Sequence, residues 1–470
     1  MTFLDRVLTI GLIHISLLGR FSSAECYDPS QTCIDPCPAE LACHQDIDCP
    51  PAFYCPPFCA IPEFCNCNAE GVWNCDNHFC AGKCIPIPTP TGPRGYEIID
   101  LGTLGGLTAN ALAVNESGVV VGEADVPSGT RHAFRWESGS MIDLGEDLPP
   151  PWSSGQAASN SNQILVQNGE GTLFLWTDGH FEQICTPQTC NFIRAIAIND
   201  SGQVLATRNG VSFLWDDNKV IDIDSLLGIS TITLNNFGSF GGATQVVTNQ
   251  YHAAIATYDT VQTLGTLGGL ESYVSDINDF GQAIGGSERA PGGDRFYWGF
   301  LWTNDQMIDL SLLLLGANGF QVGSPRSINN CGEIIGSGNY QEMVFANSGF
   351  IYQHGNALRD LFDLIPAEAK WYLLNPNDIN DHGDIVGYGF YDGDFGPYQG
   401  LTRAFLARPI PGDLNTDGNV DLKDFGHLQN AFTGEYPPPG GRCLRADADR
   451  DNDVDLADFA LFEDALPARP

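Results

Sequence analysis

Two acidic segments near the C-terminus have the residue types and the spacing of a cation-binding loop. Each spans 12 residues and places oxygen-bearing side chains at positions 1, 3, 5, 9 and 12. Carboxylate and amide oxygens at this spacing can surround a hard cation such as Ca²⁺. The candidate ligands are Asp413, Asn415, Asp417, Asn419, Asp421 and Asp424 in the first loop, and Asp447, Asp449, Asp451, Asp453, Asp455 and Asp458 in the second. We therefore predict two calcium ions, one for each loop.

The positions within each loop predict different modes of ligation. Asn419 and Asp453, at position 7, are expected to use their backbone carbonyls, and position 9 acts directly or through water. Asn452 replaces the usual glycine at position 6, which is tolerable because asparagine accepts a left-handed backbone. Without metal the clustered carboxylates repel one another, so we expect the segment to be poorly folded. An acidic surface loop with no metal is the alternative.

An apolar pattern at helical spacing follows each loop and predicts one helix after each. The apolar residues are Phe425, Leu428 and Phe432 after the first loop, and Phe459, Leu461 and Phe462 after the second. Residues 411–470 resemble a type I dockerin, a tandem of two EF-hand-like calcium loops. The resemblance implies calcium binding and docking onto a cohesin-like protein. Positions 10 and 11 are Leu422-Lys423 and Leu456-Ala457, where dockerins of cellulose-degrading complexes commonly carry hydroxyl residues.

The chain from 96 to 410 repeats a tight-turn motif, Asn-x-x-Gly followed by an apolar run. An asparagine that opens a tight turn and a glycine that closes it in a left-handed conformation are typical of β-hairpins. The copies begin at Asn115, Asn199, Asn235, Asn278, Asn329 and Asn380. A seventh, degenerate copy is placed at Asn160, with Gln163 where glycine is expected.

Each repeat continues with an aromatic strand such as His132-Ala-Phe-Arg-Trp136 and a strand such as Met141-Ile-Asp-Leu144. Four short strands in roughly 40–50 residues are typical of a β-propeller blade. The last repeat lacks its Asp-Leu strand, and an orphan strand of that type stands at the front, Tyr96 to Leu101. We predict a mainly β fold, a seven-bladed β-propeller over residues 96–410 that the front strand closes. An open solenoid or a pair of β-sandwiches is the alternative.

Three sequence motifs of this repeat resemble those of the HAF-type extracellular repeat family. They are His-Ala-Phe, Asp-Leu-Gly-Thr-Leu-Gly-Gly and Ile-Asn-x-x-Gly, and they cover residues 96–410. The family is recognised by its repeats and implies no particular reaction. His-Ala remains only at His132 and His252, and Arg403 stands at the matching place in the last repeat.

The N-terminal part predicts an exported chain. Residues 1–24 have the basic start, short apolar core and small residues of a signal peptide. Residues 25–88 form a cysteine-rich module for which we expect disulfides, with a metal cluster as the alternative, and residues 89–95 are a proline-rich linker. Its cysteines are Cys26, Cys33, Cys37, Cys43, Cys49, Cys55, Cys59, Cys65, Cys67, Cys75, Cys80 and Cys84. Cys185 and Cys190 are candidates for a local pair, while Cys331 and Cys443 have no evident partner.

Composition and motifs narrow the function. The formal net charge of −37 argues against nucleic-acid binding, which needs clustered lysine and arginine. The sequence has no nucleophile elbow, zinc-protease helix motif or phosphate loop. Recurring acids at Asp143, Asp309 and Asp363 indicate turn or cap positions. The recurring tryptophans indicate packing between blades, with a carbohydrate platform as the alternative, and they are Trp136, Trp176, Trp215 and Trp302.

These features favour a secreted, non-catalytic binding or scaffold protein. Its propeller would present a surface for a glycan or a protein, and its C-terminal segment would attach it, with calcium, to a cohesin-like partner or to the cell surface. A secreted polysaccharide-degrading enzyme, an O-glycosyl hydrolase or its accessory subunit, is the alternative, since paired carboxylates could serve that reaction. A purely structural surface protein is a third possibility.

Overall fold

The structure is a computed structural model, and it describes most of the chain after residue 94. The described residues are 95–149, 151–185, 193–217, 219–248, 250–290, 297–313, 320–340, 347–353, 358–366, 369, 371–391, 402–432, 443–451 and 453–466, with the strands β1 (Phe53–Tyr54), β2 (Cys65–Cys67), β3 (Trp73–Cys75) and β4 (Ile85–Pro86). The predicted signal peptide, the disulfides of the cysteine-rich module, the pairing of Cys185 with Cys190 and the conformation of Asn452 lie outside these residues.

Two compact units divide the chain. One consists of Met1–Thr89 with Tyr391–Leu401, and β1 pairs with β4, and β2 with β3, within it. The other consists of Pro90–Phe390 with Thr402–Pro470, and the rest of this description concerns it. Among the described residues, no helix has the length and apolar character needed to cross a lipid bilayer.

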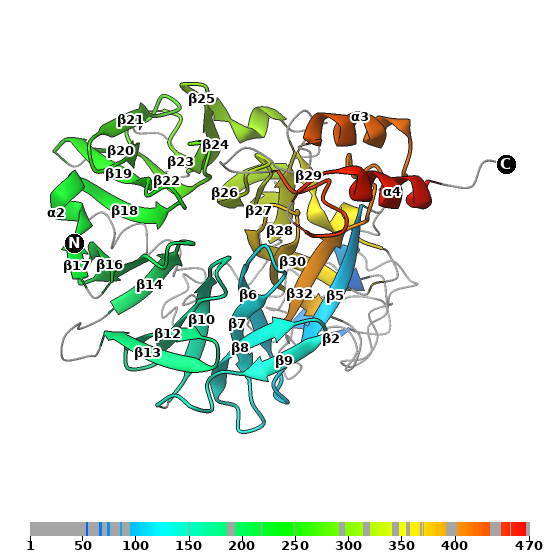
Figure 1. Ribbon diagram of the computed structural model, residues 1–470, viewed down its shortest axis with the longest axis horizontal. Helices are drawn as coiled ribbons and strands as arrows, with labels where there is room; N and C mark the ends of the chain where they lie inside the picture. Colours follow the sequence, from blue (N-terminus) through cyan, green and yellow to red (C-terminus); the bar gives the residue numbers. More distant parts are fainter. Residues whose placement is uncertain are drawn as a thin grey trace. The chain divides into compact units, whose positions relative to one another are not determined.

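Seven four-stranded sheets succeed one another in the larger unit and form the blades of a propeller (Figure 1). Blade 1 consists of β6 (Ala109–Val114), β7 (Val120–Asp125), β8 (Arg131–Glu137) and β9 (Ser140–Asp143). Blade 2 consists of β10 (Ser153–Ala158), β11 (Ile164–Asn168), β12 (Leu173–Thr177) and β13 (His180–Cys185). Blade 3 consists of β14 (Ile193–Ile198), β15 (Val204–Arg208), β16 (Val211–Asp216) and β17 (Lys219–Asp222). Blade 4 consists of β18 (Ile229–Leu234), β19 (Phe240–Val247), β20 (Gln250–Ala256) and β21 (Val261–Gly265). Blade 5 consists of β22 (Ser272–Ile277), β23 (Ala283–Ser287), β24 (Trp298–Thr303) and β25 (Gln306–Asp309). Blade 6 consists of β26 (Phe320–Ile328), β27 (Ile334–Tyr340), β28 (Asn347–Tyr352) and β29 (Arg359–Asp360). Blade 7 consists of β30 (Trp371–Ile379), β31 (Ile385–Tyr391), β32 (Thr402–Pro409) and β5 (Tyr96–Gly102).

The ring closes as the sequence predicts. β5, from the front of the repeat region, pairs antiparallel with β32 from its end, with Ile99 opposite Leu406 and Asp100 opposite Phe405. The front strand thus becomes the fourth strand of blade 7, so that strands from the two ends of the repeat region complete one sheet. The prediction of a seven-bladed propeller is confirmed.

The tight turns between the first and second strands of the blades form a closed belt of hydrogen bonds. The first strand of each blade lies beside the first strand of the next, so these strands surround the axis of the ring. The residue after each turn-opening position donates its backbone N–H to the side chain of its counterpart in the next blade, at 2.7–3.1 Å. We call these residues the axial belt: Glu116, Asn160, Asp200, Asn236, Asp279, Asn330 and Asp381. Asp381 donates to Glu116 and so completes the circle.

The turn of blade 2 differs from the sequence prediction by one residue. It opens at Ser159, whose backbone N–H donates to Gln163, and not at Asn160. Asn162 occupies the place of glycine, with a φ of 59°, where the other turns have glycines such as Gly118 at 75°. Asparagine tolerates this left-handed conformation, and it therefore replaces glycine without loss of the turn.

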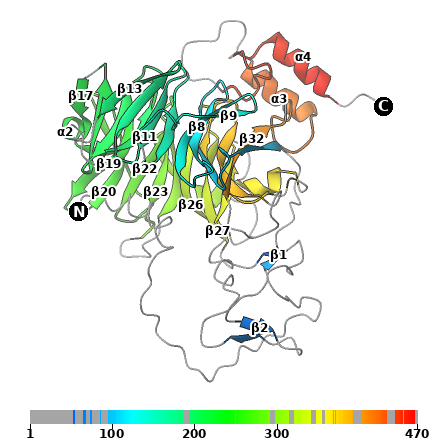
Figure 2. The same ribbon diagram turned by 90° about the horizontal axis from the view of Figure 1, so that it is seen from below.

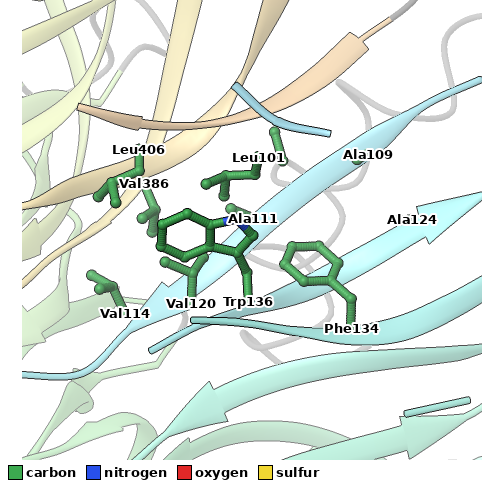
Figure 3. Packing of buried hydrophobic residues seen from close by; sticks show 11 residues of the cluster. Leu101, Ala109, Ala111, Val114, Val120, Ala124, Phe134, Trp136, Val386 and Leu406 are labelled. Atoms are coloured by element: carbon green, nitrogen blue, oxygen red, sulfur yellow. The ribbon is translucent and has the colours of Figure 1, made fainter. Parts of the chain in front are cut away.

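Apolar side chains fill the spaces between neighbouring blades. Trp136 of blade 1 packs with Leu101, Val386 and Leu406 of blade 7 (Figure 3). Trp215 packs in the same way with Leu165 and other residues of blade 2. The other two recurring tryptophans, Trp176 and Trp302, lie against similar interblade clusters. Packing between blades is therefore confirmed for all four tryptophans.

Short helices follow the fourth strands of three blades, and aspartates cap two of them. They are α2 (Ile223–Leu227), η3 (Leu310–Leu313) and η4 (Leu361–Leu364). Asp222 accepts from the N–H of Ser225 at the start of α2, and Asp360 accepts from Phe362 at the start of η4. Two longer helices, α3 (Leu422–Ala431) and α4 (Leu456–Ala465), follow the acidic loops (Figure 2).

Candidate metal centre

Residues 411–466, here called the C-terminal module, contain two loop–helix units built alike. Asp421 and Asp455 are the N-caps of α3 and α4, and each forms a capping box with the aspartate three residues later, Asp424 or Asp458. Position 9 and position 12 of each loop therefore start the helix as well as facing the loop. The predicted helix after each loop is confirmed.

The two units share a small apolar core. Leu428 of α3 and Phe462 of α4 are buried there with Ala446 and Val454. The ring of Phe425 stacks on that of Phe462 at 6.1 Å between centroids. Two residues of the predicted apolar stripes do not belong to it, because Phe432 and Leu461 are 47% and 42% exposed.

Side chains of the first loop hold its own backbone in a tight curl. Asp413, at position 1, is buried and accepts from the N–H groups of Asp417 at 3.0 Å and Gly418 at 2.9 Å. Asn415 accepts from Asp417, and Asp417 accepts from Asn419. The two oxygens of Asp424 accept from Asn415 and Asp421. All six predicted ligands of the first loop are thus connected directly to other loop positions.

The second loop repeats this scheme. Asp447, at position 1, accepts from the N–H groups of Arg450 and Asp451, and Asp458, at position 12, accepts from Ala448 and Asp455. The scheme recurs because the spacing of the acidic residues recurs, although position 4 is Thr416 in one loop and Arg450 in the other.

The second loop brings its six predicted residues into two groups that could hold metal ions. Within each group one carboxylate oxygen per residue lies within 4.8 Å of the others. The groups are Asp447, Asp449 and Asp451, and Asp453, Asp455 and Asp458. Oδ1 of Asp453 is buried and accepts no hydrogen bond from the described residues. An unsatisfied carboxylate oxygen and hard oxygen donors fit a hard cation. The backbone-carbonyl role of Asn419 and Asp453 stays a prediction.

The electrostatics of the loops depend on burial. Burial raises the pKa of Asp413 to about 6 and also raises the pKa of Asp458. The hydrogen bond from Lys423 lowers the pKa of Asp417. Because a bound cation needs ionised ligands, metal affinity at these loops falls as the solution becomes more acidic.

Sequence reasoning missed the residues by which the propeller contacts the C-terminal module. His382 lies buried between Glu116 and Asp447, with its Nδ1 and its Nε2 each 3.1 Å from a carboxylate oxygen. Burial alone would lower the pKa of His382, but the hydrogen bonds to Asp447 and Glu116 raise it to about 9. His382 follows an axial-belt residue but is not part of a recurring motif. The sequence pattern therefore does not identify it as a contact residue.

A disulfide joins Cys331 to Cys443, so the two cysteines that lacked an evident partner are partners of each other. They are separated by 112 residues in the sequence. Cys331 lies in the tight turn of blade 6, and Cys443 lies just before the second acidic loop. Only the fold brings them together, because neither has a neighbouring cysteine to suggest the pair.

The recurring blade acids have turn and pairing roles. Asp143 accepts from the N–H groups of Gly145 and Glu146 and pairs with His132 at 2.9 Å. Asp309 accepts from Ser311 and pairs with Arg289. The interpretation as turn or cap positions is confirmed for these two.

The interpretation of Asp363 as the matching acid of blade 6 was wrong. Asp360, not Asp363, lies opposite the third-strand phenylalanine, as Asp143 and Asp309 do. In blade 7 the same acid, Asp100, pairs with Arg403 at 2.8 Å. In blades 1 and 7 the residue two positions before the third-strand phenylalanine, His132 or Arg403, therefore ties the third strand to the fourth.

Two carboxylates on inner strands also escaped the sequence reasoning. Asp276 accepts from Thr233 of blade 4 and from the N–H of Ile328 of blade 6. Asp378 accepts from Ser327 of blade 6, at 2.9 Å, and from the N–H of Val114 of blade 1 at 3.0 Å. Each carboxylate thus connects three neighbouring blades. Both carboxylates lie in the short motif Asp-Ile-Asn, and this repetition could have identified them from the sequence.

The surrounding strands desolvate both groups. This burial raises the pKa of Asp276 to about 6 and that of Asp378 to about 7.

The comparisons with known proteins give information about the fold only. The chain matches no protein-family model, and no curated protein matches it. Among solved structures, it resembles TolB from Acinetobacter baumannii with 11% identity and a TM-score of 0.36, over 59% of this chain and 77% of that one. It resembles the C-terminal WD40 domain of Sif2 with 12% identity and a TM-score of 0.35, over 67% and 99%. A fungal alcohol oxidase of the AA5 family shows 12% identity and a TM-score of 0.42, over 70% and 78%. No activity, ligand or partner follows from similarity this distant.

Proposed function

We propose that the chain is a secreted, non-catalytic binding or scaffold protein of the HAF-repeat type. Its C-terminal module binds two calcium ions and attaches the chain to a cohesin-like partner or to the cell surface. Its propeller presents the recognition surface for a glycan or a protein.

The observation that carries this proposal is the duplication of the loop–helix unit. In both loops the aspartate at position 1 accepts backbone N–H groups from within the loop, and the aspartates at positions 9 and 12 form the capping box of the following helix. A conformation that appears twice, each time with carboxylates turned toward the loop, supports a common ligand. Calcium suits the oxygen-only donors and the irregular geometry better than smaller, stricter Mg²⁺.

Two exposed leucines support a docking role for the module. Leu422 and Leu456 hold the same position, the first residue of each helix, and are 81% and 71% exposed. Apolar side chains left in water at matching places form a pair of contacts for a protein partner. Leu422→Asp and Leu456→Asp should each weaken calcium-dependent capture by a cohesin-like protein about tenfold or more. Leu312→Asp is the matched control, because Leu312 is 79% exposed on blade 5.

Isothermal titration calorimetry with CaCl₂ on the full chain tests the metal. We expect two bound ions for the wild type and one for either Asp417→Asn or Asp449→Asn, whose side chains lie in different loops. Asp178→Asn changes an exposed turn aspartate of blade 2 and should leave both ions bound. Absence of binding at millimolar calcium would refute the calcium proposal.

The enzyme alternative can be tested on Asp276 and Asp378, two buried carboxylates of the inner strands. Both carboxylates accept hydrogen bonds on both oxygens from neighbouring strands, which supports a role in holding the blades together. Turnover on a panel of polysaccharides that disappears in Asp378→Asn, with the fold intact, would favour the enzyme instead.

A further inference from the structure

The closing strand of the propeller begins beneath the C-terminal module. Tyr96, the first residue of β5, is fully buried, and the guanidinium of Arg445 lies over its ring at 5.3 Å and donates to its hydroxyl at 3.0 Å. A Cβ added at Gly95 would lie 2.7 Å from Cβ of Thr416. The N–H of Ile410, which follows β32, donates to the carbonyl of Gly95. The first residues of β5 are therefore covered by both halves of the module.

Position 4 of each acidic loop contacts the propeller. Thr416 is fully buried, its hydroxyl donates to Gln353 at 2.7 Å, and Arg359 of β29 donates to its carbonyl at 2.8 Å. Arg450 donates twice to the buried carboxylate of Asp384, at 2.8 Å each. Both residues have a left-handed backbone, with φ of 53° and 63°. Because positions 3 and 5 are predicted ligands, the curl that surrounds a metal also orients position 4.

We propose that the C-terminal module is a metal-dependent latch on the closing blade: filling the two loops fixes Thr416 and Arg450 against blades 6 and 7 and so holds β5 in its sheet. This inference rests on the calcium binding proposed above. The latch has a covalent tether, since the Cys331–Cys443 disulfide joins the segment before the second loop to blade 6. His382 adds a third contact, to Asp447.

The direction of the effect follows from charge. Without metal, the carboxylates of each loop repel, and the loop relaxes away from the conformation that presents position 4. The disulfide keeps the module near the propeller, but the contacts on Gly95 and Tyr96 loosen. β5 is bonded to one neighbour in its sheet, β32, so its amides are the first to exchange with solvent when the cover loosens.

Hydrogen exchange of the full chain, with calcium or with a chelator, tests the latch. At calcium concentrations about ten times the dissociation constant, linkage predicts about tenfold slower exchange in peptides covering β5 and β32. Peptides covering β15 and β16 of blade 3, which the module does not contact in the described residues, should not change. Calorimetry on the same sample reports binding separately.

Propeller-side variants separate the latch from the metal sites. Asp384→Asn removes the negative charge and one of the two oxygens that accept from Arg450. Arg359→Gln removes the cation that donates to Thr416 and is a milder change, should the first variant fail to fold. Both should bind calcium but lose the calcium effect on β5. Asp224→Asn is the matched control in blade 3, where Asp224 accepts from Ser212 and Thr231.

Each result of this experiment is decisive. Calcium binding without slower exchange in β5 would overturn the latch and leave the proposed function standing. No calcium binding would overturn both. A calcium effect on β5 that persists unchanged in Asp384→Asn and Arg359→Gln would also overturn the latch, because position 4 would then not transmit it.

Discussion

The stability of the propeller should fall as the pH rises from about 4 to about 7, because Asp276 and Asp378 must ionise among the inner strands. In the unfolded chain both carboxyl groups ionise near their ordinary value of 3.8. In the folded chain their pKa values are raised to about 6 and about 7. Over this interval the folded state therefore holds protons that the unfolded state has released, so raising the pH favours unfolding.

The magnitude follows from the two shifts. A shift of one pKa unit corresponds to about 1.4 kcal/mol of free energy. Because neither group completes its titration between the two pH limits, Asp276 contributes a loss of about 2 kcal/mol and Asp378 a loss of about 3 kcal/mol over this interval. The rest of this acidic chain titrates as well, so the test must isolate one of these groups from the others.

Asp378→Asn isolates the larger contribution. Asparagine cannot ionise, and its carbonyl can still accept from Ser327 while its amide meets the N–H of Val114. That misplaced amide lowers stability by an amount that does not change with pH. Urea unfolding followed by tryptophan fluorescence, in calcium at constant ionic strength, gives the free energy at each pH. The difference between variant and wild type should shift in favour of the variant by about 3 kcal/mol from about pH 4 to about pH 7.

Equal pH dependence of Asp378→Asn and wild type would refute this reasoning, since Asp378 would then carry the same charge in both states throughout. Ser327→Ala gives a second arm. Its hydroxyl lowers the pKa of Asp378, so its loss should raise that pKa and steepen the fall in stability. A shallower fall in Ser327→Ala would contradict the assigned role of the hydroxyl.

Three further predictions concern single blades and use the same unfolding assay. Asn380→Ala should cost about 2–5 kcal/mol, because the carbonyl of its blade 1 neighbour and a buried N–H lose their partners, whereas Ser159→Ala at the matching place in blade 2 should cost about 1 kcal/mol. Phe405→Ala should cost about 3–5 kcal/mol, because that side chain is fully buried in the closing blade; a cost under about 1 kcal/mol would contradict this packing. Arg403→His should change stability by less than about 1 kcal/mol, because blade 1 makes the same pairing with histidine.

The sequence predicted those parts of the fold that depend on local chemistry repeated many times. A tight turn needs a left-handed residue at one place, and glycines such as Gly118 and Gly202 mark it in the printed sequence. The orphan strand at Tyr96 predicted the closure because a missing strand and an extra strand of one type must pair. Where the signal weakened, the alignment shifted by one residue, and Asn162 was not recognised as the replacement for glycine.

The sequence could not predict contacts between residues that are distant in the chain and unlike their counterparts in other repeats. His382 meets Asp447, and Cys331 meets Cys443, only because the C-terminal module lies against blades 6 and 7. The acid of blade 6 was misassigned to Asp363 because spacing along the chain does not reveal register across a sheet. Register placed Asp360 opposite Phe350, and so identified it as the matching acid.

The two loops of the module have equivalent acids but different residues at position 4, and the propeller explains the difference. Asp384 is a buried carboxylate beside the second loop, and a buried charge without a partner destabilises a fold by several kcal/mol. Burial opposes its ionisation, but Arg450 and Arg408 outweigh burial and lower its pKa. The first loop meets the cation of Arg359 instead, and there a neutral Thr416 supplies a carbonyl acceptor. Exchanging the two position-4 residues would place arginine against arginine and leave Asp384 without Arg450. The duplicated unit can therefore sit on the propeller in one orientation only, although its metal ligands alone would permit two.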